Sequence, residues 1–247
     1  MKPLLLALAL TPIALHAQDD ALKIPLVTIP QLPKTGNSIA AFTPRGWVLE
    51  KQTTGDLNND GRPDLAFVLQ DNDPRNRLKQ SADSDYIINT NPRILAIAFA
   101  NPNGTGYTLA AQNSTLIPRW TEPNQDDHFD NQQPSGDDGG TLHIARNALS
   151  IGLHYFSSMG GWDAGLTTFT FRYQNNRFEL IGLDNDNMQR GSGEETKTSA
   201  NYSTHQLTIN TRNEQTKTNK TKHRQLPNTP PKTLDDIGDG MDFEIPE

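Results

Sequence analysis

One stretch, residues 55–69, constrains the fold of this chain more than any other. It reads Gly-Asp-Leu-Asn-Asn-Asp-Gly-Arg-Pro-Asp-Leu-Ala-Phe-Val-Leu. Side-chain oxygens recur at the first, third, fifth and ninth positions of a loop. They belong to Asp56, Asn58, Asp60 and Asp64. A hard cation needs several oxygen ligands that converge on one point. Gly61 permits the sharp turn because it has no Cβ, and the carbonyl oxygen of Arg62 supplies the seventh position. We therefore expect one Ca²⁺ at this loop.

The residues after the loop indicate β-structure. The twelfth position is Phe67, so the bidentate Glu that closes an EF-hand is missing. Residues 65–69 are a short apolar run, which is typical of a buried strand. The pattern Asp-x-Asn-x-Asp-Gly-x-x-Asp before a strand resembles the FG-GAP (VCBS-type) repeats of integrin-like β-propellers. The resemblance implies a calcium-binding hairpin. The alternative is an Asx-rich hairpin turn without an ion.

The other apolar segments are short and separated by turn signals. Asn-Pro-Asn-Gly-Thr-Gly at 101–106 and Gln-Asn-Asn at 174–176 are examples. Expected strands cover residues 47–51, 65–69, 93–99, 107–111, 142–144, 149–155, 166–173, 177–183, 196–202 and 206–210. The calcium pattern occurs once, whereas a propeller requires repeated blades. We therefore expect a single all-β domain of antiparallel hairpins in a meander, with one FG-GAP-like calcium hairpin, and not a full propeller.

Residues 1–17 have the composition of a secretory signal peptide. Lys2 precedes an apolar run that ends at Ala17. This run is shorter than the ~20 residues that a membrane span needs, so we expect cleavage and no transmembrane segment in the mature protein. The chain has no cysteine, which excludes disulfides and thiolate chemistry. Residues 91–95 and 171–182, with the Gly-Gly-Trp loop, resemble a group of uncharacterised exported bacterial proteins. We expect a periplasmic or secreted protein.

Composition and charge divide the rest of the chain. Residues 18–38 are rich in proline and predict an extended leader. Residues 39–212 hold the all-β domain, and residues 213–247 predict either a polar edge strand or a flexible acidic tail. Loss of Lys2 with the signal peptide changes the net charge from −7 to −8. A net negative charge argues against nucleic acid or an anionic membrane as the main partner.

The segment Ser-Met-Gly-Gly-Trp-Asp-Ala-Gly, residues 158–165, predicts a loop between two strands. Its glycines leave Trp162 little neighbouring bulk. An exposed Trp beside Asp163 is the composition of an interface anchor. The alternative is that Trp162 folds back and caps the end of the core, because tryptophans are mostly buried.

Other polar residues suggest weaker possibilities. The acidic cluster at 126–138 predicts a solvated loop, with binding of a second cation or of a basic partner as the alternatives. Sequence signatures of zinc peptidases, serine hydrolases and phosphate-binding loops are absent. Asp163, Glu179 and Glu194 are candidates for a carboxylate pair of the kind that hydrolyses glycosides.

We expect a calcium-binding, non-enzymatic binding module of the cell envelope, such as an inhibitor or immunity-type protein, whose partner is a protein or an envelope component. The alternative is a hydrolase that acts on peptidoglycan or a glycan.

Overall fold

The two continuous apolar runs of the sequence form neighbouring central strands. These strands, β3 (Asp64–Asp71) and β6 (Arg93–Ala100), belong to a five-stranded antiparallel sheet of order β1-β7-β6-β3-β2. The remaining strands are β1 (Thr35–Gly36), β2 (Trp47–Gly55) and β7 (Tyr107–Asn113). The structure is a computed structural model that describes residues 22–80, 84–129, 141–157 and 162–246. The predicted signal peptide lies outside the described residues.

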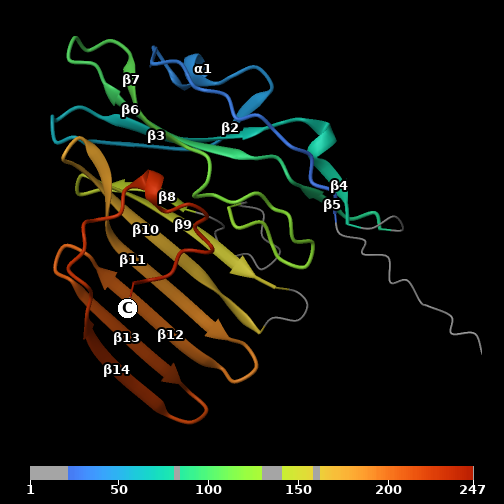
Figure 1. Cartoon of the computed structure of the whole chain (residues 1–247), viewed down its shortest axis with the longest axis vertical. Helices are drawn as coiled ribbons and strands as arrows, with labels where there is room; N and C mark the ends of the chain where they lie inside the picture. The colour runs from blue at the N-terminus through green and yellow to red at the C-terminus, as the bar shows by residue number, and fades with distance from the viewer. Residues whose placement is uncertain (1–21, 81–83, 130–140, 158–161, 247) are drawn as a thin grey trace, which may run out of the picture.

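A second sheet of seven strands is a simple meander. Its strands are β8 (Thr141–Ala145), β9 (Ala148–Phe156), β10 (Asp163–Gln174), β11 (Arg177–Gln189), β12 (Glu194–Asn201), β13 (Gln206–Asn213) and β14 (Thr218–Gln225). Each strand pairs antiparallel with the next one in the sequence, as Figure 1 shows. Two of the hairpin turns place consecutive residues at positive φ, Arg146 and Asn147 in one and Asn175 and Asn176 in the other. Such turns match the right-handed twist of the strands that they connect.

The two sheets share one hydrophobic core. Ala66, Val68, Leu95 and Ile97 of the first sheet pack with residues of the second sheet such as Ile151, Phe169 and Leu183. The sheets approach closest where β2 meets β8. A Cβ added to Gly55 would lie 2.5 Å from Ile144 Cγ2, so only glycine fits at this point. This packing confirms a single all-β domain of open antiparallel sheets in the described residues, and not a propeller.

The outer face of the first sheet is also buried. The short helix α1 (Ile39–Phe42) and the extended leader cover it, and Leu32 and Phe42 pack on Phe67 and Ile94. The leader is held by a hydrogen bond from the backbone N–H of Leu109 to the carbonyl oxygen of Lys34, 2.8 Å. Burial on both faces explains why β3 and β6 are continuous apolar runs rather than alternating ones.

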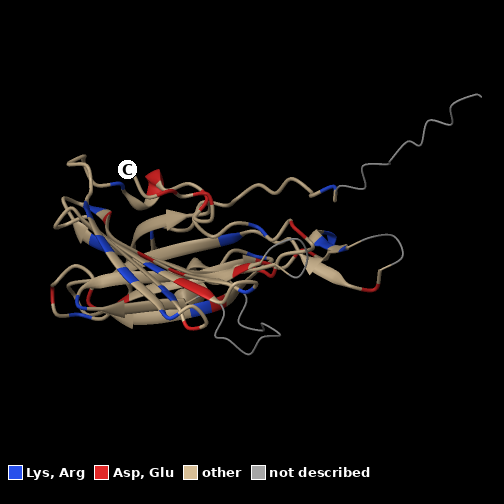
Figure 2. Ribbon diagram, turned by 90° about the horizontal axis from the view of Figure 1, so that it is seen from below, with Lys and Arg blue, Asp and Glu red and all other residues tan. Residues whose placement is uncertain are grey.

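The chain after β13 adds an edge strand and a covering segment. Strand β14 is exposed along its length and carries Lys220, Lys222 and Arg224, and such charges discourage pairing with another chain. Figure 2 shows basic residues distributed along the strands. Beyond β14, the chain passes through a 3-10 turn, η2 (Leu234–Asp236), and then crosses the face of the second sheet (Figure 1). No helix in the described part of the chain is long and apolar enough to span a bilayer.

Two polar segments that lie outside the expected strands contain strands in the structure. Residues 71–85 contain a 3-10 turn, η1 (Pro74–Asn76), and strand β4 (Arg77–Lys79), which pairs with β5 (Ile87–Asn89). The segment Asp-Asn-Asp-Asn at 184–187 lies within β11, and β10 already begins at Asp163. Strands β4 and β5 have three residues each, too few to show a period, and residues 184–187 are polar on both faces of β11, so the sequence shows no apolar alternation there.

Candidate functional site

The predicted calcium loop connects β2 to β3. Gly61 and Asn59 have positive φ angles of 81° and 63°, which curl the loop. The carboxylate of Asp56 turns inward and accepts hydrogen bonds from the backbone N–H groups of Gly61, 2.8 Å, and Asp60, 3.2 Å. The amide oxygen of Asn58 also accepts from the Asp60 N–H, 3.1 Å. The side-chain oxygens therefore gather on the inner side of the loop.

Asp64 lies at the base of the loop and is fully buried. Its Oδ2 accepts a hydrogen bond from the backbone N–H of Leu57, and its Oδ1 accepts one from Ala100, both at 2.8 Å. Burial raises the pKa of Asp64, the two backbone hydrogen bonds act to lower it, and the nearby Asp60 charge raises it further. The net result is a raised pKa. Asp64 fastens the loop to the end of β6 whether or not an ion is bound.

The oxygen donors of the loop fit a hard cation, but the Asp60 side chain would have to move before it could bind one. Carboxylate and amide oxygens are the ligands that Ca²⁺ prefers. The oxygens of Asp64 each retain a lone pair after accepting one N–H. The carboxylate of Asp60, however, forms an ion pair with Arg62. In the described residues, no three acidic or histidine side chains are arranged to hold a metal. Asp60 would therefore have to leave Arg62 before it could act as a ligand.

The second predicted site, Trp162 with Asp163, lies at the start of β10. The side chain of Trp162 is 62% exposed. Its carbonyl oxygen accepts a hydrogen bond from the backbone N–H of Arg190, 2.7 Å, which anchors the backbone to the end of β11. Its ring lies close to Gly191. This position is that of an exposed aromatic side chain on an ordered backbone.

Asp163 opens onto a groove on the inner face of the second sheet, the face that also carries the core. Strand register places two rows of side chains on this face, since residues directly opposite each other project on the same side. One row runs Leu153, Thr167, Asn185, Thr198, and the other runs Tyr155, Gly165, Asn187, Thr196. The groove has a volume of about 480 Å³, and its floor includes Thr167, Asn185, Asn187 and Thr198.

Tyr155 crosses the floor of the groove because its neighbour is glycine. A Cβ on Gly165 would lie 2.5 Å from the Tyr155 hydroxyl and 2.0 Å from the carbonyl oxygen of Asp186. Without that Cβ, the Tyr155 ring reaches over β10, and its hydroxyl accepts a hydrogen bond from Asn187 Nδ2, 2.7 Å. Burial raises the pKa of Tyr155, the hydrogen bond from Asn187 lowers it and the Asp163 charge raises it, with a net increase. The hydroxyl is therefore held neutral.

The other wall of the groove is the C-terminal segment 240–245. Met241, Phe243 and Ile245 are half-buried and pack against the core, whereas Asp242 and Glu244 between them face solvent. Phe243 meets Phe169 edge to face, with ring centroids 5.7 Å apart. The backbone N–H of Gly240 donates to the carbonyl oxygen of Leu116, 3.1 Å. We call this segment the strap.

The groove continues into a second hollow of about 340 Å³. The two hollows share Tyr155, Asp163 and Met241, and the second one also includes His128 and Asp242. His128 Nδ1 donates to the carbonyl oxygen of His154, 2.8 Å, and its own carbonyl accepts from the N–H of His154, 2.9 Å. Together the hollows form an elongated cleft along the strap.

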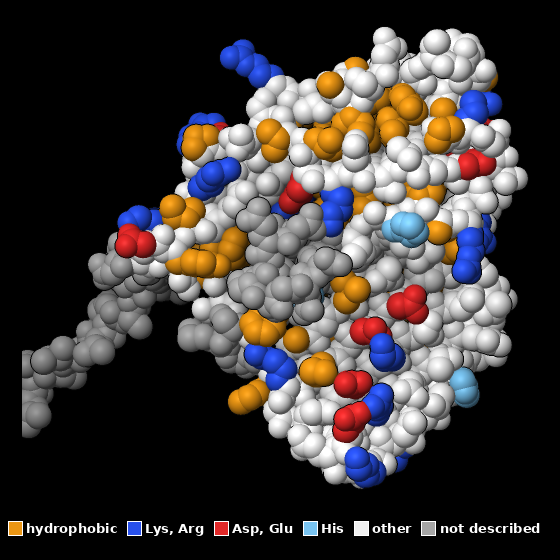
Figure 3. Space-filling view, turned by 180° about the vertical axis from the view of Figure 1, so that it is seen from behind, with side chains coloured by type: hydrophobic (Ala, Val, Ile, Leu, Met, Phe, Trp, Pro, Cys, Tyr) orange, Lys and Arg blue, Asp and Glu red, His pale blue; other side chains and the backbone are white. Residues whose placement is uncertain are grey.

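The outer face of the same strands has a different chemistry. Charged residues alternate in sequence with the residues of the groove floor and therefore project from the opposite face. Examples are Asp184 and Asp186 on β11 and Glu195 and Lys197 on β12. Lys197 forms an ion pair with Asp186, 2.9 Å. In the lower half of Figure 3, acidic and basic side chains alternate across this face. The strands therefore carry charges on the outside and neutral amides and hydroxyls on the inside.

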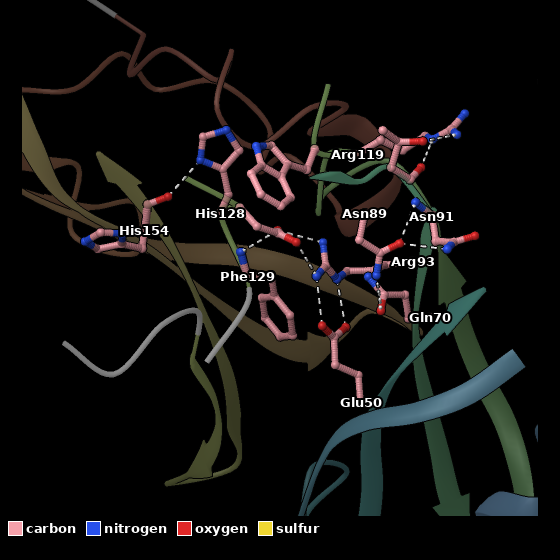
Figure 4. A network of polar contacts seen from close by, with 12 residues as sticks. Glu50, Gln70, Asn89, Asn91, Arg93, Arg119, His128, Phe129 and His154 are labelled. Carbon is pink, nitrogen blue, oxygen red and sulfur yellow. Dashed lines mark hydrogen bonds and ion pairs between the residues drawn. The ribbon is translucent and has the colours of Figure 1, made fainter. Parts of the chain in front are cut away.

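The structure describes only the first part of the acidic cluster at 126–138, which includes Asp126 and Asp127. Asp127 is buried and forms two hydrogen bonds with Arg93, Oδ1 to Nη1 and Oδ2 to Nη2, both 2.8 Å (Figure 4). Burial raises the pKa of the adjacent Asp126, the charges of His154 and His128 act to lower it, and Asp127 raises it, with a net increase. Residues 130–138 lie outside the described residues. Asp127 is therefore a structural ion-pair partner.

The three carboxylates considered for hydrolysis lie in different surroundings. The side chain of Glu179 is buried at the other end of β11, where it accepts hydrogen bonds from Gln174, Asn175 and Arg177. Burial acts to raise the pKa of Glu179, but these hydrogen bonds outweigh it and lower the pKa. Asp163 lies at the groove and Glu194 begins β12 two strands away. Glu179 does not meet the other two.

Comparison with protein-family models, curated proteins and solved structures gave no match, so the site is interpreted from its own geometry. The sequence interpretation proposed Trp162 and Asp163 and did not include the residues on the floor of the groove. A signal was present: along 184–187 and 195–198, charged residues alternate with neutral Asn or Thr. This period of two indicates strands whose faces differ in charge rather than in hydrophobicity.

Proposed function

We propose that this protein is a calcium-binding, exported, non-enzymatic binding module of the cell envelope. The observation that carries the proposal is the exposed Trp162, which directly precedes Asp163, a residue that lines the elongated cleft. A large aromatic side chain on an ordered backbone, next to a groove with convergent polar groups, has the properties of a ligand-binding surface. The signal-like residues 1–17 support export, and the curled oxygen-rich loop at 56–64 supports calcium binding. A direct test is a pull-down from a periplasmic extract with calcium and with chelator.

Trp162→Ala should separate binding from folding. Because the side chain is 62% exposed, we expect the free energy of unfolding to change by no more than ~0.5 kcal/mol. If Trp162 is an interface anchor, ligand binding should weaken by ~2 kcal/mol or more. Thermal melts and a quantitative pull-down measure the two effects. A loss of ~3–5 kcal/mol in stability would instead mean that Trp162 belongs to the core in solution.

Calcium should raise the melting temperature through the loop at 56–64. An ion that binds only the folded state adds about 2.7 kcal/mol of stability at a hundredfold excess over Kd. Asp60→Ala should abolish most of this gain, because Asp60 supplies the central ligand. Arg62→Ala is the matched control: it frees Asp60 from its ion pair and retains the backbone carbonyl, so calcium should bind at least as well. Identical melts with calcium and with chelator would refute the site.

The alternative function, hydrolysis of an envelope polymer, has less support. A glycosidase needs two carboxyl groups about 5–10 Å apart, and Glu179 is engaged in a buried cluster of its own. Asp163 and Asp242 do line the same hollow. Incubating the mature protein with peptidoglycan and soluble glycans, alongside Asp163→Asn, tests this alternative, since released reducing ends that disappear in the variant would establish an enzyme.

A further inference from the structure

We propose that the groove between the strap and strands β10–β12 binds a neutral oligosaccharide. This inference rests on the proposed binding function and names the class of ligand. The groove differs from an ordinary seam between two layers because its two walls do not match. The strap presents Met241, Phe243 and Ile245, whereas the floor presents amides and hydroxyls.

A purely structural layer would place apolar side chains beneath an apolar strap, as happens at Phe169 under Phe243. Beyond that contact, the floor changes to Thr167, Asn185 and Asn187. Polar groups facing an apolar wall lose their interactions with water and gain no packing. A sugar ring fits between two such walls because its C–H faces are apolar and its rim carries hydroxyl groups. The mismatch therefore favours a ligand with both kinds of surface.

The hydrogen-bonding groups on the floor suit hydroxyls. A side-chain amide both donates and accepts, as a sugar hydroxyl does. Asn185 Nδ2 donates to Thr167 Oγ1 and Asn187 Nδ2 donates to the Tyr155 hydroxyl, each at 2.7 Å. These bonds fix the orientation of both amides, and each amide also carries an Oδ1 that can accept a hydrogen bond. The two acceptors are thus held in place on adjacent rows of the floor by the protein itself.

The shape and charge of the cleft narrow the choice of ligand. The two connected hollows, about 480 and 340 Å³, provide room for a chain of several rings rather than for a single small molecule. The floor has no charged side chain, and the carboxylates at the cleft, Asp163 and Asp242, would repel acidic sugars. An extended peptide would gain affinity mainly from main-chain hydrogen bonds at a sheet edge. This groove lies over the face of the sheet, whose backbone groups are already paired.

The test is binding of defined soluble oligosaccharides to the mature protein by calorimetry. The panel contains neutral glucan oligomers, N-acetylglucosamine oligomers and uronic acid oligomers. We expect at least one neutral member to bind, and Asn187→Ala to weaken it about tenfold. Asn210→Ala is the matched control. Asn210 also bonds across strands, to Thr221 at 2.9 Å, but it projects from the outer face. It should leave the dissociation constant unchanged.

Thr198→Val provides a second variant that retains volume and removes only a hydroxyl from the floor, in case Asn187→Ala is unstable. No binding by any neutral member, tighter binding of the uronic acid oligomers, or equal losses in Asn187→Ala and Asn210→Ala would overturn the inference. If the pull-down captures a protein through Trp162 while no sugar binds, the oligosaccharide proposal is wrong and the proposed binding function is retained. If a bound oligosaccharide is cleaved, oligosaccharide binding in the groove is supported and the proposed non-enzymatic function is wrong.

Discussion

Arg93→Met should lower the free energy of unfolding by about 3–5 kcal/mol. The side chain of Arg93 is 1% exposed and lies between two carboxylates. It binds Glu50 through Nε and Nη2, at 2.7 and 2.8 Å, and Asp127 through Nη1 and Nη2 (Figure 4). Burial alone would lower the pKa of Arg93, but the two carboxylates raise it above its ordinary value. Methionine would leave both carboxylates in the interior without a counter-charge. Urea denaturation measures the loss.

The position of this triad explains why its effect should be global. Glu50 is the extra residue of a β-bulge in β2, between Leu49 and Lys51 in the register, and a bulge redirects a side chain. Asp127 belongs to the connection between the sheets. Arg93 therefore joins an edge strand, a central strand and that connection.

Two controls make the Arg93 prediction specific. Arg75→Met removes a similar ion pair, to Asp73, in which the Arg75 side chain is 85% exposed, so its effect should be no more than ~0.5 kcal/mol. Adding Glu50→Gln and Asp127→Asn to Arg93→Met removes the buried charges together and should recover part of the loss. A small effect of Arg93→Met would show that the carboxylates reach water in solution.

Asp64→Ala should destabilise the protein by about 3 kcal/mol even in the presence of chelator. Its carboxylate accepts the backbone N–H groups of Leu57 and Ala100 in a fully buried position. Without it, both donors are left unsatisfied, at about 1–3 kcal/mol each. Chemical denaturation with chelator measures this structural contribution without the ion.

Asp60→Ala is the control for Asp64→Ala, because Asp60 lies in the exposed part of the loop. In chelator it should change stability little, whereas in calcium it should lose the gain from the ion. Asp64→Asn retains one acceptor oxygen and should lose about half as much stability as Asp64→Ala. Equal effects of Asp60→Ala and Asp64→Ala in chelator would contradict the assignment of separate roles.

The strand meander could be predicted from the sequence because its signals are local. Apolar alternation at Leu149, Ile151 and Leu153 and turn residues such as Asn175 and Asn176 act within a few positions of one another. The strands that could not be predicted from the sequence are those without an apolar face. The segment at 184–187 continues β11 because β10 and β12 pair with it on both sides. Pairing partners far along the chain supply that order.

The sequence alone determined the fold class and the curled loop at 56–64, since each depends on neighbouring residues. Only the tertiary structure decided the rest. The exposure of Trp162 depends on what packs near it. The groove depends on register between three strands, on the missing Cβ of Gly165 and on the strap, which returns from the end of the chain. The pairing of Arg93 with Glu50 and Asp127 spans 43 and 34 residues. Such contacts follow from packing of the whole chain, which local patterns do not encode.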